Sequence, residues 1–128
     1  MCFHRFATLA AALALLAAAS AGQANAQGNA DAGKKVFDKC KVCHSLDVGK
    51  NGVGPSLAGV FGRKSGTGAG FKFSKPMIDK AVVWNESTIA EYVVDPKAYI
   101  PGNKMIFPGL KKESEMADLM AFLKAAAQ

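Results

Sequence analysis

Side chains that bind transition metals are scarce in this 128-residue sequence, which has three cysteines and two histidines. Cys2 and His4 lie within the first few residues, and the other three, Cys40, Cys43 and His44, are clustered. A structural zinc site usually takes four such ligands. If the N-terminal segment is absent from the mature protein, the three clustered residues are too few for a structural zinc site.

Long apolar runs are absent after the N-terminal segment, so no later segment is expected to span a membrane. Phe6 to Ala19 is apolar or small apart from Thr8, and Ala24-Asn25-Ala26 fits the cleavage pattern of a secretory signal peptide. A transmembrane anchor is the alternative, but the run is short and rich in alanine. We expect a signal peptide over residues 1–26, cleavage near Ala26, a single domain over residues 27–128, and a periplasmic protein.

Alternation of apolar and polar residues is also lacking, so no strand is expected. Asn29 can cap a helix running to about Lys41, and Asn85 can cap another that ends at Asp95-Pro96. A last helix opening at Glu113 has an apolar stripe at helical spacing, formed by Met116, Leu119, Met120 and Leu123. The residues from Gly49 to Gly70 are rich in glycine and predict a long loop. The fold class is therefore all-α, with three to four short helices and large loops.

The sequence Cys40-Lys41-Val42-Cys43-His44 is a Cys-x-x-Cys-His motif, the attachment pattern of c-type haem. On one helical turn both thiols can add to the vinyl groups of a single porphyrin, and the adjacent imidazole can bind the iron. A structural disulfide is an alternative in an oxidising compartment. A thioredoxin-like pair would need a βαβ setting, which the pattern lacks. The motif favours covalent haem.

A second axial ligand for the iron has few candidates, because the mature chain has no second histidine. Methionine is the next choice. Met116 and Met120 belong to the apolar stripe, and Met77 lies in a short stretch of undetermined structure. Met105 lies between Pro101-Gly102 and Pro108-Gly109, in a segment suited to carry a ligand. From the loop context alone, ligation and ordinary packing are equally compatible with Met105.

The sequence resembles the class I cytochromes c, especially the short bacterial c2-like and the mitochondrial-like members. The resemblance covers about Ala32 to Ala125 and implies the cytochrome c fold, wrapped around one covalently bound haem. It depends on an ordered set of motifs: Cys40 to His44, Gly54-Pro55, Gly62-Arg63-Lys64, Trp84, Tyr92, and Tyr99 to Met105.

The resemblance assigns roles to single residues. Cys40 and Cys43 attach haem c, and His44 and Met105 are its axial ligands. The Pro55 carbonyl accepts the imidazole N–H, which orients the ring. Trp84 and Arg63 donate to a buried propionate, Tyr92 approaches the methionine sulfur, and Asn103 replaces a common threonine but can still donate a hydrogen bond. Phe73 stands where many members have a tyrosine that bonds a propionate, and a phenylalanine has no hydroxyl to make that bond. The residues expected to wall the haem pocket are Leu57, Val60, Trp84, Val93, Phe107 and Leu123.

The implied function is soluble, single-haem electron transfer between Fe(III) and Fe(II), not enzymatic catalysis of a small-molecule substrate. A five-coordinate peroxidase or gas sensor would need an open iron position and a distal acid–base group, and a haem-free disulfide domain is the third alternative.

The net charge of +6 and the pI near 9.4 favour acidic partners. Expected partners are acidic faces of an oxidase, a bc-type complex, a photosynthetic reaction centre or a periplasmic dehydrogenase, which a monomer would meet through a lysine ring. Nucleic acid is not expected, because no basic–aromatic array is present. The ring comprises Lys39, Lys41, Lys97, Lys104, Lys111 and Lys112.

Overall fold

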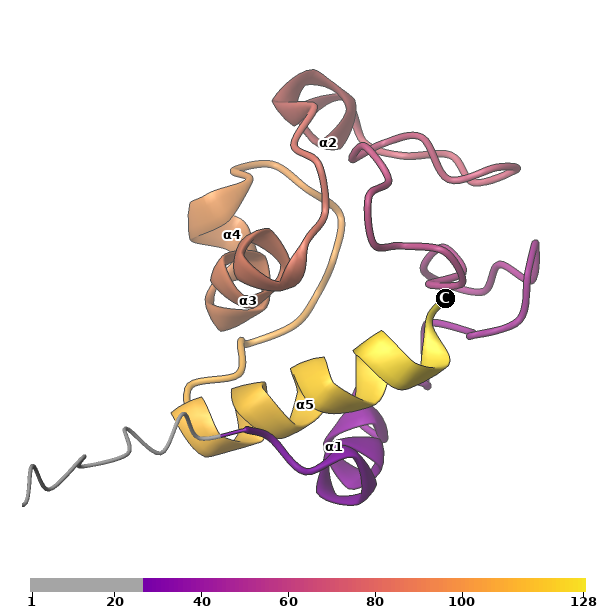
Figure 1. Ribbon diagram of the computed structural model, residues 1–128. Helices are drawn as coiled ribbons and strands as arrows, with labels where there is room; N and C mark the ends of the chain where they lie inside the picture. Colours follow the sequence, from indigo (N-terminus) through magenta and orange to yellow (C-terminus); the bar gives the residue numbers. More distant parts are fainter. Residues whose placement is uncertain (1–26) are drawn as a thin grey trace, which may run out of the picture.

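The computed structural model describes residues 27–128, and the expected signal peptide lies outside the described residues. This part of the chain forms five helices and no strand, so the all-α prediction is confirmed (Figure 1). Two of the five, α2 and α4, are very short and were not predicted. None of the helices in residues 27–128 is long and apolar enough to cross a membrane. The helices are α1 (Ala30–Phe37), α2 (Lys75–Lys80), α3 (Glu86–Val94), α4 (Pro96–Tyr99) and α5 (Glu113–Ala126).

The two terminal helices, α1 and α5, cross in direct contact at one side of the molecule (Figure 1). Gly33 lies at the crossing, where a β-carbon would overlap the carbonyl oxygen of Asp118 and come within 2.8 Å of Phe122 Cβ. The backbone N–H of Asn29 donates to Asp118 Oδ1 at 2.7 Å, and the Phe37 and Phe122 rings are 5.3 Å apart. A glycine in α1 therefore permits the close approach that the two helices show.

Helix α1 ends at Phe37, four residues earlier than Lys41, so the predicted C-terminal boundary is wrong. Beyond Phe37 the backbone tightens. The N–H groups of Asp38, Lys39 and Cys40 each donate to the carbonyl three residues earlier. This 3₁₀-type pattern is common at helix ends. The chain continues in hydrogen-bonded turns to Cys43, and in the Cys-x-x-Cys-His motif Cys40, Cys43 and His44 are partly buried.

Helix α3 begins and ends as predicted. Asn85 Oδ1 accepts from the N–H of Thr88, and Thr88 Oγ1 accepts from the N–H of Asn85, which makes a capping box. The helix ends at Val94, before Asp95 and Pro96, because the residue before proline disfavours the helical region. Pro96 then starts α4, which lasts a single turn.

The glycine-rich region from Gly49 to Gly70 contains no helix, as predicted, and its only regular pairing is an isolated bridge between Lys64 and Val83. Ser65 is almost fully buried, where its hydroxyl donates to the Met77 carbonyl at 2.9 Å and accepts from the N–H of Val82. This serine therefore ties the loop to α2 and to the segment that follows this helix.

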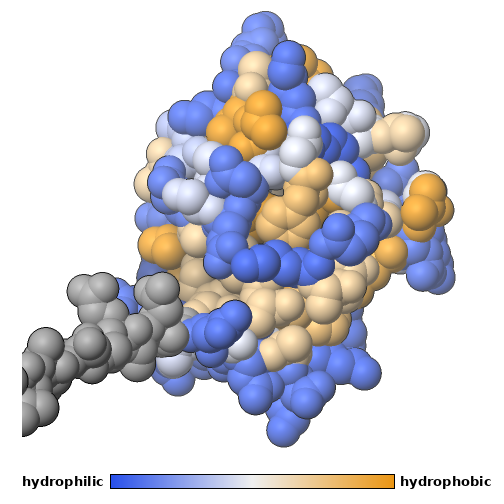
Figure 2. All heavy atoms as spheres, in the orientation of Figure 1, coloured by the Kyte–Doolittle hydropathy of each residue, from blue (hydrophilic) through white to orange (hydrophobic). Residues whose placement is uncertain are grey.

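The apolar core lies between α5, α3 and the loops. Figure 2 shows hydrophilic residues over most of one face, interrupted by apolar residues near its middle. Three of the four stripe residues of α5 are buried, and α3 buries one face. The buried residues of these two helices are Leu119, Met120 and Leu123 on α5 and Ile89, Tyr92 and Val93 on α3.

Candidate functional site

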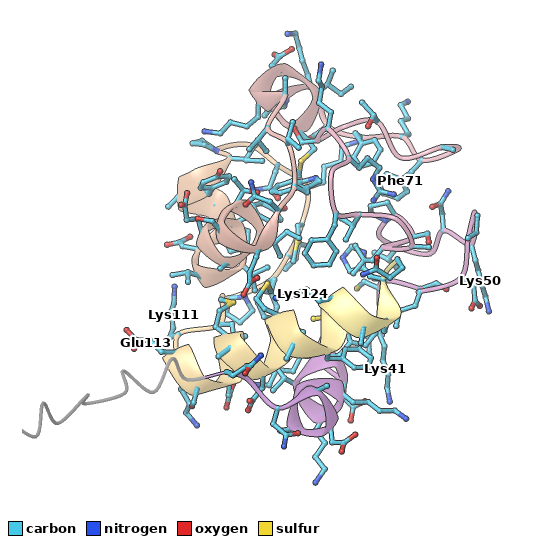
Figure 3. The ribbon with its side chains drawn as sticks, in the orientation of Figure 1. Lys41, Lys50, Phe71, Lys111, Glu113 and Lys124 are labelled. Carbon is cyan, nitrogen blue, oxygen red and sulfur yellow. The ribbon has the colours of Figure 1, made fainter. Side chains whose placement is uncertain are left out.

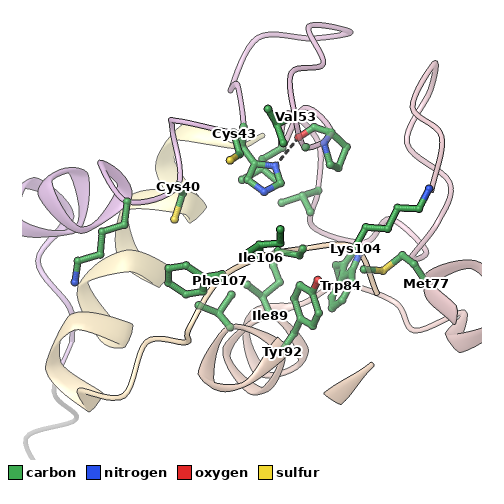
Figure 4. Close-up of a pocket in the computed structure, with 18 of the residues that line it drawn as sticks. Cys40, Cys43, Val53, Met77, Trp84, Ile89, Tyr92, Lys104, Ile106 and Phe107 are labelled. Carbon is green, nitrogen blue, oxygen red and sulfur yellow. Dashed lines mark hydrogen bonds between the residues drawn. The ribbon is translucent and has the colours of Figure 1, made fainter. Parts of the chain in front are cut away.

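A cavity of about 300 Å³ lies between the loops and the inner faces of α3 and α5. All six residues predicted to wall a pocket line it: Leu57, Val60, Trp84, Val93, Phe107 and Leu123. Figure 4 shows Cys40 and Cys43 on one wall and Ile89, Tyr92 and Trp84 on the facing wall. Its lining is mostly apolar, with a few polar groups at defined places, as is typical of a cofactor site.

The two thiols of the motif, on Cys40 and Cys43, line this cavity and are not bonded to each other. A turn positions them, because the N–H groups of Cys43 and His44 both donate to the Cys40 carbonyl at 3.0 Å. Burial raises the pKa of the Cys40 thiol to about 11. This thiol therefore stays protonated near neutral pH. Cys40 and Cys43 form no disulfide.

His44 presents one defined nitrogen to the cavity. Its Nδ1 lies 2.7 Å from the Pro55 carbonyl oxygen, the bond drawn as a dashed line in Figure 4. A carbonyl only accepts, so Nδ1 carries the hydrogen and Nε2 holds a free lone pair. Burial lowers the pKa of His44, and the bond to Pro55 partly opposes this. The ring is therefore a neutral, oriented imidazole, the form that binds a metal.

Two methionines, Met105 and Met77, also line the cavity. Met105 is half-buried and lies between the exposed residues Lys104 and Ile106. Met77 belongs to α2 and lies near Trp84 and Lys104 in Figure 4. Met116 and Met120 do not line the cavity, in agreement with their predicted place on the packed stripe. The thioether candidates are thus reduced to two.

The residues present fit a covalently bound porphyrin. The cavity is apolar, two unpaired thiols stand on one wall, and a neutral imidazole with a free Nε2 adjoins them. At least one soft thioether completes the donor set. This combination of ligands is that of a c-type haem site.

Residues 30–127 match the family model described as Cytochrome c. The chain belongs to the cytochrome c family. It is 57% identical over 89 residues to cytochrome c2 iso-2 of Magnetospirillum fulvum, which covers 70% of this chain and 93% of the relative. It is 46% identical over 117 residues to cytochrome c-554 of Methylosinus trichosporium, covering 91% and 87%. Cytochrome c of Guizotia abyssinica is 50% identical over 101 residues, covering 77% and 91%.

The predicted resemblance to class I cytochromes c is thereby confirmed, and with it the cofactor: the chain is a haem electron carrier that binds haem c covalently, with Cys40 and Cys43 in the attachment motif. When bound, this group supplies reversible one-electron exchange between Fe(III) and Fe(II). The chain's own residues line the pocket with mostly apolar side chains and hold the imidazole in one orientation.

The predicted supporting residues divide into two sets. Trp84 and Tyr92 line the cavity, with their rings 5.2 Å apart, and burial raises the pKa of Tyr92 to about 12, so its phenol stays protonated. Arg63 and Asn103 do not line it. The Arg63 guanidinium donates to the carbonyls of Ala58 at 3.2 Å and Ser56 at 3.0 Å. Its role toward a propionate stays a prediction.

The lysines of the predicted ring differ in their surroundings. Lys39 and Lys104 line the cavity. Figure 3 shows Lys41 and Lys111 at opposite ends of α5. Several of the six lysines are engaged within the chain. The contacts are Lys39 and Lys112 with Glu115, Lys41 with Asp38, and Lys111 with the Val94 carbonyl.

Two features of the site were missed from the sequence. Gly54 packs directly against the imidazole of His44, although only its neighbour Pro55 had been given a role. Val42, Val53 and Ile106 are 74%, 81% and 95% exposed, yet all three line the cavity and make an apolar rim at its mouth. The sequence signal for this rim was Val42, because a residue between the two attachment cysteines must lie next to the pocket.

Proposed function

We propose that this cytochrome is a diffusible, single-haem electron carrier with His44 and Met105 as axial ligands of the iron, and not an enzyme. The orientation of His44 by Pro55 supports the first ligand. The place of Met105 in the cavity lining, in a loop braced by prolines and glycines, supports the second. Two retained ligands leave little to reorganise on electron transfer and leave no position open for oxygen or peroxide.

The ligand set also bears on the redox potential. A thioether is soft and uncharged, so it favours Fe(II) over Fe(III) and raises the reduction potential. The apolar lining of the pocket, with Trp84 and Val93 among its buried residues, also disfavours the additional charge of Fe(III).

An optical comparison of methionine variants tests the ligand. The wild type should show the weak long-wavelength band of iron bound to methionine sulfur, and Met105→Ala should abolish it. Met77→Ala is the matched control, since Met77 lines the same cavity and should keep the band. Loss of the band in the control alone would overturn the assignment of Met105. High-spin iron in the wild type at neutral pH would overturn the electron-carrier proposal.

We further propose that an N-terminal leader over residues 1–26 is removed near Ala26 and that the carrier, a monomer, works in the periplasm between membrane redox complexes. Intact mass of the exported protein tests this, because the expected species begins at Gln27 and carries one haem. A mass that retains the leader would contradict the cleavage.

The partner surface is proposed to be the apolar rim with the lysines Lys39 and Lys104 beside it. Electrostatic steering toward an acidic face weakens with salt. Lys104→Glu should therefore slow electron transfer to an isolated bc-type complex or oxidase at low ionic strength, and the difference should shrink at high ionic strength. Lys35→Glu makes the same charge change on α1, outside this surface, and should have a smaller effect. Equal effects of both variants would contradict the docking surface.

A further inference from the structure

Asn103 is the centre of a hydrogen-bond cluster between α4 and Met105. Its Nδ2 lies 2.7 Å from the carbonyl oxygens of both Pro96 and Ile100. Its Oδ1 accepts from the backbone N–H of Met105 at 2.8 Å and from the hydroxyl of Tyr92 at 3.2 Å. An amide has two N–H groups and two acceptor positions, so every hydrogen-bonding position of this side chain is filled.

The orientation of this amide is determined by its partners. If the group were rotated by half a turn, its NH₂ would face the N–H of Met105, and its oxygen would face two carbonyl oxygens. Both arrangements are repulsive, so only the observed orientation satisfies the surrounding groups. The two ends of the amide therefore have different tasks.

The donor end is anchored to a rigid platform. Pro96 and Ile100 are almost fully buried. Between Ile100 and Asn103 the chain makes a type II turn, because Gly102 has φ +83° after Pro101 and the N–H of Asn103 donates to the Ile100 carbonyl at 3.1 Å. Backbone and side chain of Asn103 thus contact the same buried carbonyl, which fixes the residue relative to the core.

The acceptor end of the Asn103 amide binds the more exposed backbone at Met105. Met105 is only half-buried, and Ile106 beside it is 95% exposed, so packing alone constrains this stretch weakly. The bond from the Met105 N–H to Asn103 Oδ1 is the direct tie between this backbone and the platform. The single hydroxyl hydrogen of Tyr92 is directed to the same oxygen.

We propose that Asn103 is a positioning residue that clamps Met105 in the cavity wall, and that Tyr92 acts on Met105 through Asn103. This inference rests on the proposed ligation by Met105. It differs from the roles that the resemblance implies, since both amide hydrogens of Asn103 are used by backbone carbonyls and the Tyr92 hydroxyl donates to an amide and not to the sulfur. Asn103 touches neither the cavity nor the reacting atoms and acts through Met105.

Displacement of the methionine by added imidazole measures the clamp in the intact holoprotein. Imidazole binds ferric iron only when the Met105 side chain leaves, so its apparent affinity reports how easily the loop opens. Asn103→Leu, which keeps the size and loses all the bonds, should increase the affinity about 10- to 100-fold. Asn103→Thr has one hydroxyl in place of the amide and should give a smaller increase. It also serves if the leucine variant does not fold.

The role of Tyr92 is tested by combining variants. Tyr92→Phe should increase imidazole affinity in the wild type and should have no further effect in the Asn103→Leu background. Additive effects would show that the tyrosine acts on Met105 independently and would overturn that half of the proposal. Asn85→Ala is the control, because it removes the N-cap of α3 and lowers stability, but it should leave imidazole affinity within about twofold.

Failure of the clamp and failure of the proposed ligation give different results. If Met105→Ala raises imidazole affinity strongly but the Asn103 variants match the wild type, Met105 is the ligand and the clamp is refuted. If Met105→Ala leaves imidazole affinity unchanged, the ligation itself is refuted, and the clamp with it.

Discussion

Gly54 lies against the imidazole ring of His44. A β-carbon at this position would come within 2.8 Å of Nδ1 and 2.9 Å of Nε2, closer than real β-carbons approach other atoms. The backbone of Gly54 is held in place, because its N–H donates to the Cys43 carbonyl at 2.9 Å. The glycine is required for space, since its φ is not in the left-handed region. It and Pro55 therefore support the same ring from two directions.

Gly54→Ala should push the imidazole away from the Pro55 carbonyl. Forcing an additional methyl into a packed site costs about 1–3 kcal/mol, so the urea midpoint should fall and the optical spectrum should show altered axial ligation. Gly49→Ala is the control: its φ of +71° strains an alanine, but no atom lies within 4 Å of the added carbon. That variant should lose stability and keep the spectrum. A normal spectrum for Gly54→Ala would contradict the packing argument.

Much of this site could be predicted from the sequence because it depends on short-range motifs. The spacing of the two cysteines and the histidine in the sequence identifies the attachment thiols and the imidazole. The cap at Asn85 and the helix end before Pro96 depend on local backbone preferences. The six expected wall residues all line the cavity.

What could not be predicted depends on contacts made in three dimensions. The tight approach of Gly54 to His44 is one example, since a glycine in a loop equally indicates a turn. The hydrogen bonds that Asn103 donates are another example, because the accepting carbonyls belong to the buried backbone of α4 and the turn that follows it. Helices α2 and α4 are too short to produce a periodic pattern.

The crossing of α1 and α5 depends on the absence of a side chain at position 33. Gly33→Ala would gain helix propensity of about 1 kcal/mol, but the added carbon would overlap the backbone of Asp118. We expect a net loss of about 1–3 kcal/mol in the free energy of unfolding, measured by urea denaturation. Lys34→Ala, at the neighbouring exposed position of α1, should change stability by less than about 0.5 kcal/mol. A stabilised Gly33→Ala protein would show that the helices can separate without cost.

The cavity predicts that the chain cannot fold stably without its cofactor. An empty, closed cavity of 300 Å³ would cost at most about 7 kcal/mol at roughly 24 cal/mol per Å³, which is comparable with the whole stability of about 5–15 kcal/mol of a small domain. The double variant Cys40→Ser, Cys43→Ser should therefore lack cooperative unfolding by circular dichroism. Val42→Ser leaves both thiols in place and should fold with haem attached. Cooperative unfolding of the haem-free chain would contradict this estimate.

Glu115 links two of the predicted docking lysines. Its carboxylate lies 2.9 Å from Lys39 Nζ and 3.3 Å from Lys112 Nζ, and hydrogen bonds from Lys39 and then Lys112 lower its pKa. A carboxyl whose pKa is lower in the folded state stabilises that state above its unfolded pKa, and this contribution is lost as the pH falls through the folded value. The effect is that of a surface ion pair and is weakened by salt.

Glu115→Gln should therefore lower the urea midpoint at pH 7 and low ionic strength, and the difference from the wild type should disappear at pH values below the carboxyl titration and in high salt. The same variant releases Lys39 and Lys112 from their internal partner, so it should also speed low-salt electron transfer to an acidic partner. Asp38→Asn is the matched control, because it makes the same change in net charge but frees only Lys41. If both variants speed the reaction equally, net charge explains the effect, and the position of Glu115 between the two lysines does not.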